Sequence, residues 1–198
     1  YQSFRGLEVL DDVLPKLRGA CVRRNFALCA TYSSQLDLAC LVCGHWPKSA
    51  KTKRLIFCMG PLAGIRVLDF TRVVAGPLAT RILADQGAEV IKVEPPEGDL
   101  SRTFPPLLEN EITPYFAQQN AGKLFCSFDL SHDETPQLVA ELATKCDVIV
   151  ENFRPGVMAK YGLDYETLSK KNPRLVYCSI TGFGQTGPWA NRRAYAPI

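Results

Sequence analysis

Residues 65–94 read Ile65-Arg-Val-Leu-Asp-Phe-Thr-Arg-Val-Val-Ala-Gly-Pro-Leu-Ala-Thr-Arg-Ile-Leu-Ala-Asp-Gln-Gly-Ala-Glu-Val-Ile-Lys-Val-Glu94. Residues 65–70 have the short apolar run of a buried strand, and residues 88–94 have a second one. Between them, residues 77–86 predict a helix, because Pro77 stands in its first turn and Gly87 follows its last. A strand, a helix and a strand within about thirty residues form a βαβ unit, whose strands are parallel and whose crossover is right-handed.

The same alternation continues toward the C-terminus. Further strands are predicted at residues 123–130, 147–151 and 174–180, and a helix at residues 133–145. Shorter helical segments are predicted after Arg154-Pro-Gly156 and from Asp164, a helix-capping residue, through Lys171. The sequence therefore predicts an α/β fold with a Rossmann-like, doubly wound parallel sheet.

Charge is distributed unevenly along the chain. Residues 1–58 hold nine Lys and Arg against four Asp and Glu, whereas residues 59–198 hold fourteen against sixteen. The main body is thus slightly acidic and lacks the clustered basic surface that a nucleic-acid partner requires. No apolar run reaches the roughly 20 residues needed to span a bilayer, so no membrane partner is predicted either.

The eight cysteines lack the spacing of a disulfide framework. Free thiols packed in apolar cores are expected, in a reducing compartment, which points to the cytosol or a mitochondrial matrix. Cys40, Cys43 and His45 form half of a zinc-site pattern, with Cys21 and Cys29 as distant candidates, but the spacing matches no zinc finger. We therefore predict no metal and interpret residues 1–58 as an extension, either weakly ordered or artefactual.

A glycine-rich loop, Thr181-Gly-Phe-Gly-Gln-Thr-Gly-Pro188, follows the last predicted strand. Ligands of open parallel sheets bind in this kind of position. The loop lacks the Gly-Lys-Ser/Thr ending of a nucleotide-hydrolysing P-loop, and residues 64–76 lack dinucleotide-binding spacing. Nucleotide hydrolysis and NAD binding are both disfavoured.

Four strings together resemble the class III CoA-transferase family, also called CaiB/BaiF after L-carnitine dehydratase and bile-acid-inducible protein F. They are Pro61 to Pro77, Gly87-Ala-Glu-Val-Ile-Lys-Val-Glu94, Val150-Glu-Asn-Phe-Arg-Pro-Gly156 and Tyr177 to Pro188. The resemblance covers residues 59–198 and implies the N-terminal part of a large CoA-binding domain, truncated at its C-terminal end. It also implies interlocked homodimers and a reaction that moves coenzyme A from an acyl-CoA to a carboxylic acid.

The resemblance further implies which residues contact coenzyme A. The loop after the first strand would line the adenosine and pantetheine path. Residues at and beyond the end of the 147–151 strand match positions that contact coenzyme A, and Lys160 among them is suited to a phosphate as a point charge. The implied residues are Arg72, Val73, Val74, Ala75, Asn152, Phe153, Arg154, Lys160 and Arg193. Each also has a structural interpretation: a solvated charge for the cations, a turn for Asn152 and a core position for Phe153.

Two positions depart from relatives of the family. Pro95 stands where some members have an Arg, which removes one partner for a phosphate, and Gly122 stands where many have an Asn. Lys123, which follows, is interpreted as structural. The exact adenine pose is therefore the feature that these differences affect most.

The family's chemistry uses an Asp carboxylate that attacks the thioester and forms a covalent intermediate. The resemblance places this Asp beyond Ile198, so no catalytic residue is expected among these 198 residues. Asp69, Asp85, Glu94 and Asp99 are interpreted as structural, with Asp99 pairing locally with Arg102.

Two alternative functions stay open at this point. An α-methylacyl-CoA racemase needs a His near Tyr195, whereas His45 and His132 both lie outside the matched site. A non-catalytic CoA-binding or dimerising remnant is the other.

Overall fold

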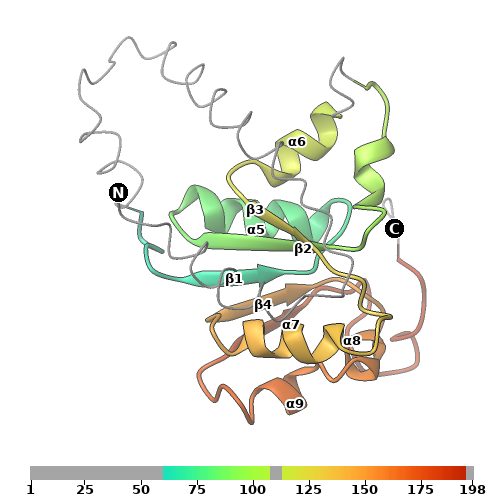
Figure 1. The fold of residues 1–198 in the computed structure, drawn as a ribbon. Helices are drawn as coiled ribbons and strands as arrows, with labels where there is room; N and C mark the ends of the chain where they lie inside the picture. Colours follow the sequence, from blue (N-terminus) through green and yellow to red (C-terminus); the bar gives the residue numbers. More distant parts are fainter. Residues whose placement is uncertain (1–59, 108–112, 195–198) are drawn as a thin grey trace.

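A computed structural model describes residues 60–107 and 113–194 of the chain. Its centre is a five-stranded sheet in the order β3-β2-β1-β4-β5, in which every pair of neighbours is parallel (Figure 1). The strands are β1 (Arg66–Asp69), β2 (Glu89–Glu94), β3 (Leu124–Ser127), β4 (Val148–Glu151) and β5 (Val176–Ser179). The predicted α/β fold with a parallel sheet is confirmed.

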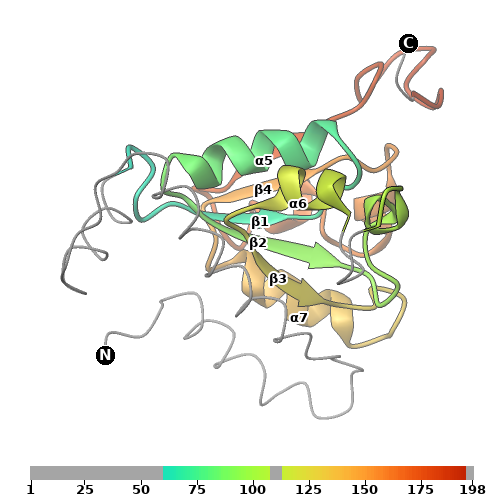
Figure 2. The ribbon, with the colours of Figure 1, turned by 90° about the horizontal axis from the view of Figure 1, so that it is seen from above.

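Helices cover both faces of the sheet, as Figure 2 shows for α5 and α7. On one side lies α5 (Ala75–Asp85), with α6 (Pro114–Asn120) packed against it. On the other lie α7 (Thr135–Ala143), α8 (Val157–Lys160) and α9 (Tyr165–Leu168). A short 3₁₀ helix, η2 (Leu100–Thr103), follows β2.

Alternate residues of the strands fill two cores, because successive side chains point to opposite faces. The larger core joins Leu68, Ile91 and Ile149 to the α7 side. The smaller core joins Val67, Val90 and Val150 to the α5 side. The sheet is therefore buried on both faces near its centre, as expected for a parallel sheet.

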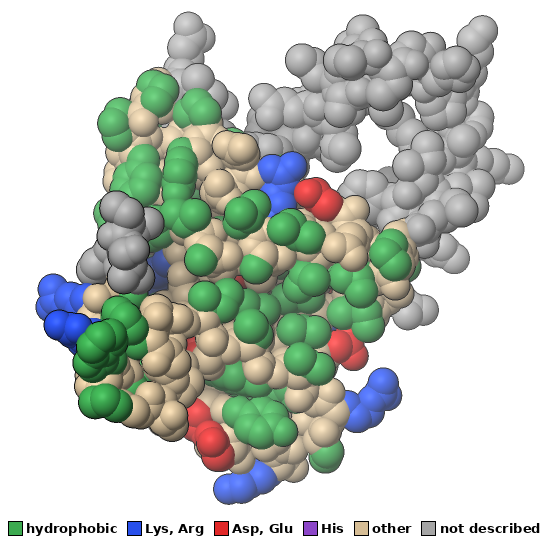
Figure 3. Space-filling view, turned by 180° about the vertical axis from the view of Figure 1, so that it is seen from behind, with side chains coloured by type: hydrophobic (Ala, Val, Ile, Leu, Met, Phe, Trp, Pro, Cys, Tyr) green, Lys and Arg blue, Asp and Glu red, His purple; other side chains and the backbone are tan. Residues whose placement is uncertain are grey.

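The α5 side also carries exposed apolar side chains, which gather over much of the face seen in Figure 3. Leu78 and Ile82 of α5 are 44% and 48% exposed, and Val176 of β5 is 59% exposed. Val176 lies in register with Val148, on the same side as α5. Cys178, on the same edge strand, is exposed rather than packed in an apolar core as expected, whereas Cys146 is buried.

The observed elements differ from the predicted ones mainly at their ends. Helix α5 begins at Ala75 rather than Pro77, because the chain before Pro77 already adopts helical geometry. Helix α6 and η2 were not predicted, although Thr113 caps α6 by accepting a hydrogen bond from Phe116 N at 2.9 Å. The extension 1–58, with Cys40, Cys43 and His45, lies outside the described residues.

Candidate functional site

Two loops meet at the carboxyl ends of β1 and β4, the central neighbours of the sheet. From β1 the chain crosses one face through α5 to β2, and from β3 it crosses the other face through α7 to β4. The direction of winding therefore reverses between β1 and β4. Ligands of open α/β sheets bind in the crevice at such a switch point.

Arg72 and Asn152 join the two loops directly. The Arg72 backbone N donates to Asn152 Oδ1 at 2.8 Å, and Asn152 Nδ2 donates to Arg72 O at 2.8 Å. The Arg72 guanidinium lies over the Phe153 ring, 5.1 Å from its centroid. The structure thus brings together three of the predicted site residues and leaves the Arg72 side chain exposed.

Val73, Val74 and Ala75 carry the chain from this junction into α5. Val73 has a φ of 69°, in the left-handed region that a β-branched side chain disfavours. Val74 is the N-cap of α5 and Ala75 its first residue. No acidic side chain stands in the first turn of α5, so the positive end of its dipole lies at the junction, where the Asp99 carboxylate also accepts from Val73 N.

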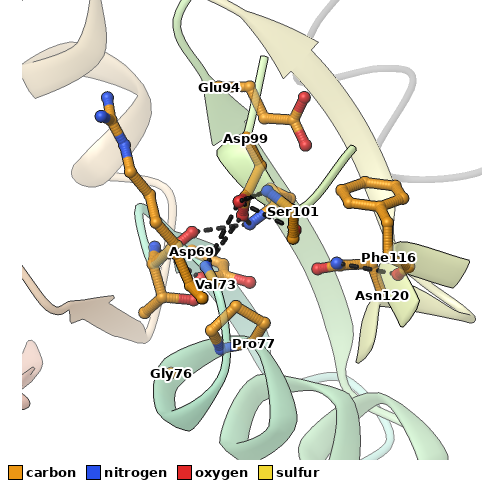
Figure 4. A network of polar contacts seen from close by, with 12 residues as sticks. Asp69, Val73, Gly76, Pro77, Glu94, Asp99, Ser101, Phe116 and Asn120 are labelled. Atoms are coloured by element: carbon orange, nitrogen blue, oxygen red, sulfur yellow. Dashed lines mark hydrogen bonds and ion pairs between the residues drawn. The ribbon is translucent and has the colours of Figure 1, made fainter. Parts of the chain in front are cut away.

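Beneath the loop lies a network of buried charges (Figure 4). The Asp69 carboxylate accepts from Thr71 N at 2.9 Å, Thr80 Oγ1 at 2.6 Å and Lys123 Nζ at 2.9 Å. Lys92 Nζ donates to Thr71 O at 2.6 Å and to Asp99 Oδ2 at 3.1 Å. Each buried lysine therefore has a buried aspartate as its partner, which burial of a charge requires.

The surroundings shift two pKa values in this network. Burial lowers the pKa of Lys123 to about 8, although Asp69 acts in the opposite direction. Burial alone would raise the pKa of Asp99, but Lys92 and the hydrogen bonds from Ser101 outweigh burial and hold it below its ordinary value. Asp99 is therefore ionised near neutral pH.

Arg154 and Lys160 lie on the α8 side of the switch point. Arg154 lines a cavity of about 480 Å³ together with Glu151, Tyr177 and Gln185 of the glycine-rich loop. Burial raises the pKa of Glu151, whose Oε2 accepts from Phe153 N at 2.8 Å. Lys160 is the last residue of α8 and is exposed.

Arg193 lies at the end of the described chain and is exposed. The segment after β5 extends away from the sheet in Figure 2. Within the described ranges, no hydrogen bond or ion pair joins Arg193 to either loop of the switch point. The structure therefore does not bring this predicted residue to the site.

The expected pair between Asp99 and Arg102 is wrong. Arg102 binds Glu94 instead, at 2.8 and 3.1 Å, and its guanidinium lies 3.7 Å from the Phe116 ring centroid. Asp99 points inward and pairs with Lys92 of β2. The Lys92 side chain is fully buried, so its charge needs a carboxylate partner. Glu94 is the last residue of β2.

Sequence reasoning missed Lys92 as part of the site's support. A signal was present, since a single Lys inside the apolar strand 88–94 has to find a buried partner. Lys123 is structural as predicted, with its Nζ bonded to Asp69 Oδ2, Pro77 O and Asn120 Oδ1.

The residues that the structure describes offer neither a metal centre nor a membrane-spanning helix. No group of three or more His, Cys, Asp or Glu side chains there is arranged to hold a metal ion. In the same residues, no helix has the length and apolar character to cross a membrane.

Residues 62–198 match the CoA-transferase family III. The chain is 51% identical to the succinate–glutarate CoA-transferase of Agrobacterium fabrum, a match covering 68% of this chain and 36% of the relative. It is 47% identical to human succinyl-CoA:glutarate CoA-transferase and 46% identical to the acetyl-CoA:oxalate CoA-transferase of Acetobacter aceti, over 70% of this chain and 32% and 36% of those proteins. The chain thus spans about a third of the length of the curated relatives it matches.

Solved structures give the same result. A CAIB/BAIF family protein from Brucella suis superposes with a TM-score of 0.66 at 48% identity, covering 69% of this chain and 37% of that one. An Asp-to-Ala variant of Rv3272 from Mycobacterium tuberculosis superposes with a TM-score of 0.64 at 44% identity, with the same coverage. The chain therefore belongs to the CoA-transferase family III.

Proposed function

We propose that the crevice between β1 and β4 binds coenzyme A, as part of an enzyme that transfers coenzyme A from an acyl-CoA to a carboxylic acid. The observation that carries the proposal is the reciprocal hydrogen bonding of Arg72 and Asn152 at the switch point. It fixes two ligand-facing loops from distant parts of the sequence. Family membership supplies the class of ligand.

The charges around the crevice suit an anionic ligand. The Arg72 side chain is exposed at the junction, and the N-terminus of α5 adds its partial positive charge. Arg154 and Lys160 are exposed on the α8 side, where Arg154 lines a cavity together with Glu151, Asp164 and Glu166. Guanidinium and ammonium groups bind phosphates well, the first in a fork and the second as a point charge. Coenzyme A, with its pyrophosphate and 3′-phosphate, matches this arrangement in charge.

For the acceptor we propose a short dicarboxylic acid, because relatives are named for glutarate, oxalate and mesaconate. Covalent transfer requires a carboxylate nucleophile, which we expect outside these 198 residues. A homodimer and a location in the cytosol or mitochondrial matrix stay predictions from the sequence.

Calorimetry with coenzyme A tests the binding step. We expect Asn152→Ala to weaken binding about tenfold, the effect of losing one to two net hydrogen bonds that shape the site. Gln137→Ala, which removes an exposed amide from α7, is the matched control and should bind like the wild type. Absence of binding by the wild-type protein would refute the proposal.

Mass spectrometry of the products tests the reaction in the complete protein. Succinyl-CoA is supplied with glutarate, oxalate or mesaconate, and formation of the corresponding CoA thioester is measured. Release of free coenzyme A without a new thioester would contradict the assignment as a transferase.

A further inference from the structure

Hydrogen bonds from side chains hold the backbone of each residue in the loop from Thr71 to Val73. Thr71 N donates to Asp69 at 2.9 Å and Thr71 O accepts from Lys92 Nζ at 2.6 Å. Arg72 N and O are both bonded to Asn152. Val73 N donates to the Asp99 carboxylate at 3.2 and 3.3 Å.

These contacts form an outer and an inner clamp. The outer clamp is Asn152, which lies beside the proposed ligand. The inner clamp is the ion pair of Lys92 and Asp99, whose side chains are 0% and 1% exposed. The inner clamp therefore acts on the loop from within the protein and has no surface with which to touch a ligand.

The inner clamp binds the loop at Val73, the residue with a strained backbone. Val73 adopts a φ of 69°, which a β-branched residue keeps only when its surroundings enforce it. Asp99 itself is fixed by Ser101, whose N and Oγ donate to Oδ1 at 2.9 and 2.8 Å (Figure 4). Asp99, held in place by Ser101 of η2, thus fixes the position of Val73 N.

Strain of this kind gathers where a backbone must take a shape that a ligand needs. We propose that Lys92 and Asp99 are positioning residues for coenzyme A, which hold the Thr71–Val73 loop in its ligand-binding shape without contacting the ligand. This inference rests on the proposed binding of coenzyme A between β1 and β4.

Only a fraction of the molecules has the loop in the conformation that the ligand needs, and the apparent affinity is reduced in proportion to that fraction. Without the inner clamp, Val73 relaxes toward negative φ and the competent loop becomes a minor form. Glycine at position 73 populates the left-handed region freely, so it removes the need for the clamp.

The test measures the dissociation constant of coenzyme A by calorimetry, together with the free energy of unfolding in urea. Asp99→Asn should weaken binding at least about tenfold, the population loss expected once the strained form is no longer enforced. In a Val73→Gly background the same substitution should weaken binding far less. A merely structural role of Asp99 predicts equal losses in both backgrounds.

A second variant covers the case in which Asp99→Asn fails to fold because Lys92 is left without a partner. Replacing both residues, Lys92→Met with Asp99→Leu, removes the ion pair without leaving a buried charge. It should fold and should also bind at least about tenfold more weakly. Glu89→Gln is the control, since Glu89 pairs with Arg66 at the opposite end of β1 and β2.

The outcomes separate the two proposals. If the wild type does not bind coenzyme A, the proposed function fails and this inference with it. If the wild type binds and the folded variants keep its dissociation constant, the inference alone is overturned. A loss that Val73→Gly reverses, with binding by Glu89→Gln unchanged, supports it.

Discussion

Replacing Lys123 by Met tests whether the buried charges stabilise the fold. Methionine keeps the apolar stem and removes the ammonium group, whose Nζ lies 2.9 Å from each of Asp69 Oδ2, Pro77 O and Asn120 Oδ1. All three acceptors lose a donor, and Asp69 keeps only the amide and hydroxyl donors of Thr71 and Thr80.

The expected loss follows from leaving one charge of the pair buried alone. Removing a single partner from a buried ion pair costs about 3–5 kcal/mol. The remaining hydrogen bonds to Asp69 place Lys123→Met near the lower end, at about 3 kcal/mol. This is a large part of the 5–15 kcal/mol that stabilises a typical domain.

Urea unfolding of the complete protein near pH 7, followed by circular dichroism, measures the change. The double variant Asp69→Asn with Lys123→Met should lose less than the sum of the two single variants, because the charges interact. Lys170→Met, at an exposed position, should change the free energy by less than about 0.5 kcal/mol. A loss below about 1 kcal/mol for Lys123→Met would refute the reasoning.

Three further outcomes follow from described contacts. The pKa of Lys123 lies near 8 in the folded protein and at 10.5 ordinarily, so the unfolded chain binds more protons between these two values. The free energy of unfolding should therefore rise with pH in this range. Urea titrations at several pH values should show the rise for the wild type and not for Lys123→Met. Gly76→Ala places a Cβ 2.3 Å from the Thr71 side chain and should cost about 1–3 kcal/mol, measured as a lower urea midpoint. Asp164→Ala removes the cap that accepts from Thr167 N at 3.0 Å and should cost about 0.5–2 kcal/mol, seen as faster amide exchange in α9.

The sequence allowed the sheet and the position of the two loops to be predicted, because both depend on local patterns. Apolar runs give the strands, and the carboxyl ends of parallel strands share one edge of the sheet. Arg72 and Asn152 each follow one of these strands, so the sequence predicts that both lie at that edge, and the family resemblance is what singles them out.

The support of the site could not be predicted in the same way. The partner of Asp99 depends on which side chain reaches it in three dimensions, and the nearer cation in sequence, Arg102, is drawn away by Glu94 and Phe116. The left-handed φ of Val73 likewise results from long-range contacts and not from its own preference. Arg193, which is exposed near the end of the described residues, stays a prediction of the family resemblance.

The order of strands in the sheet has a consequence for how the protein is made. β1 is the central strand and pairs along one edge with β4, where Val67 lies opposite Val148. That edge of β1 therefore stays unpaired while the ribosome synthesises the residues between β1 and β4. The two buried ion pairs, in contrast, use only residues 69–123 and can close during that interval. Their partners lie nearer in sequence than Arg72 and Asn152 do, so less entropy is lost in closing the loops between them, and the inner contacts of the loop after β1 should form first. Asn152 would then form its hydrogen bonds to a loop whose inner contacts are already in place, so the buried side of the crevice would form before its outer side.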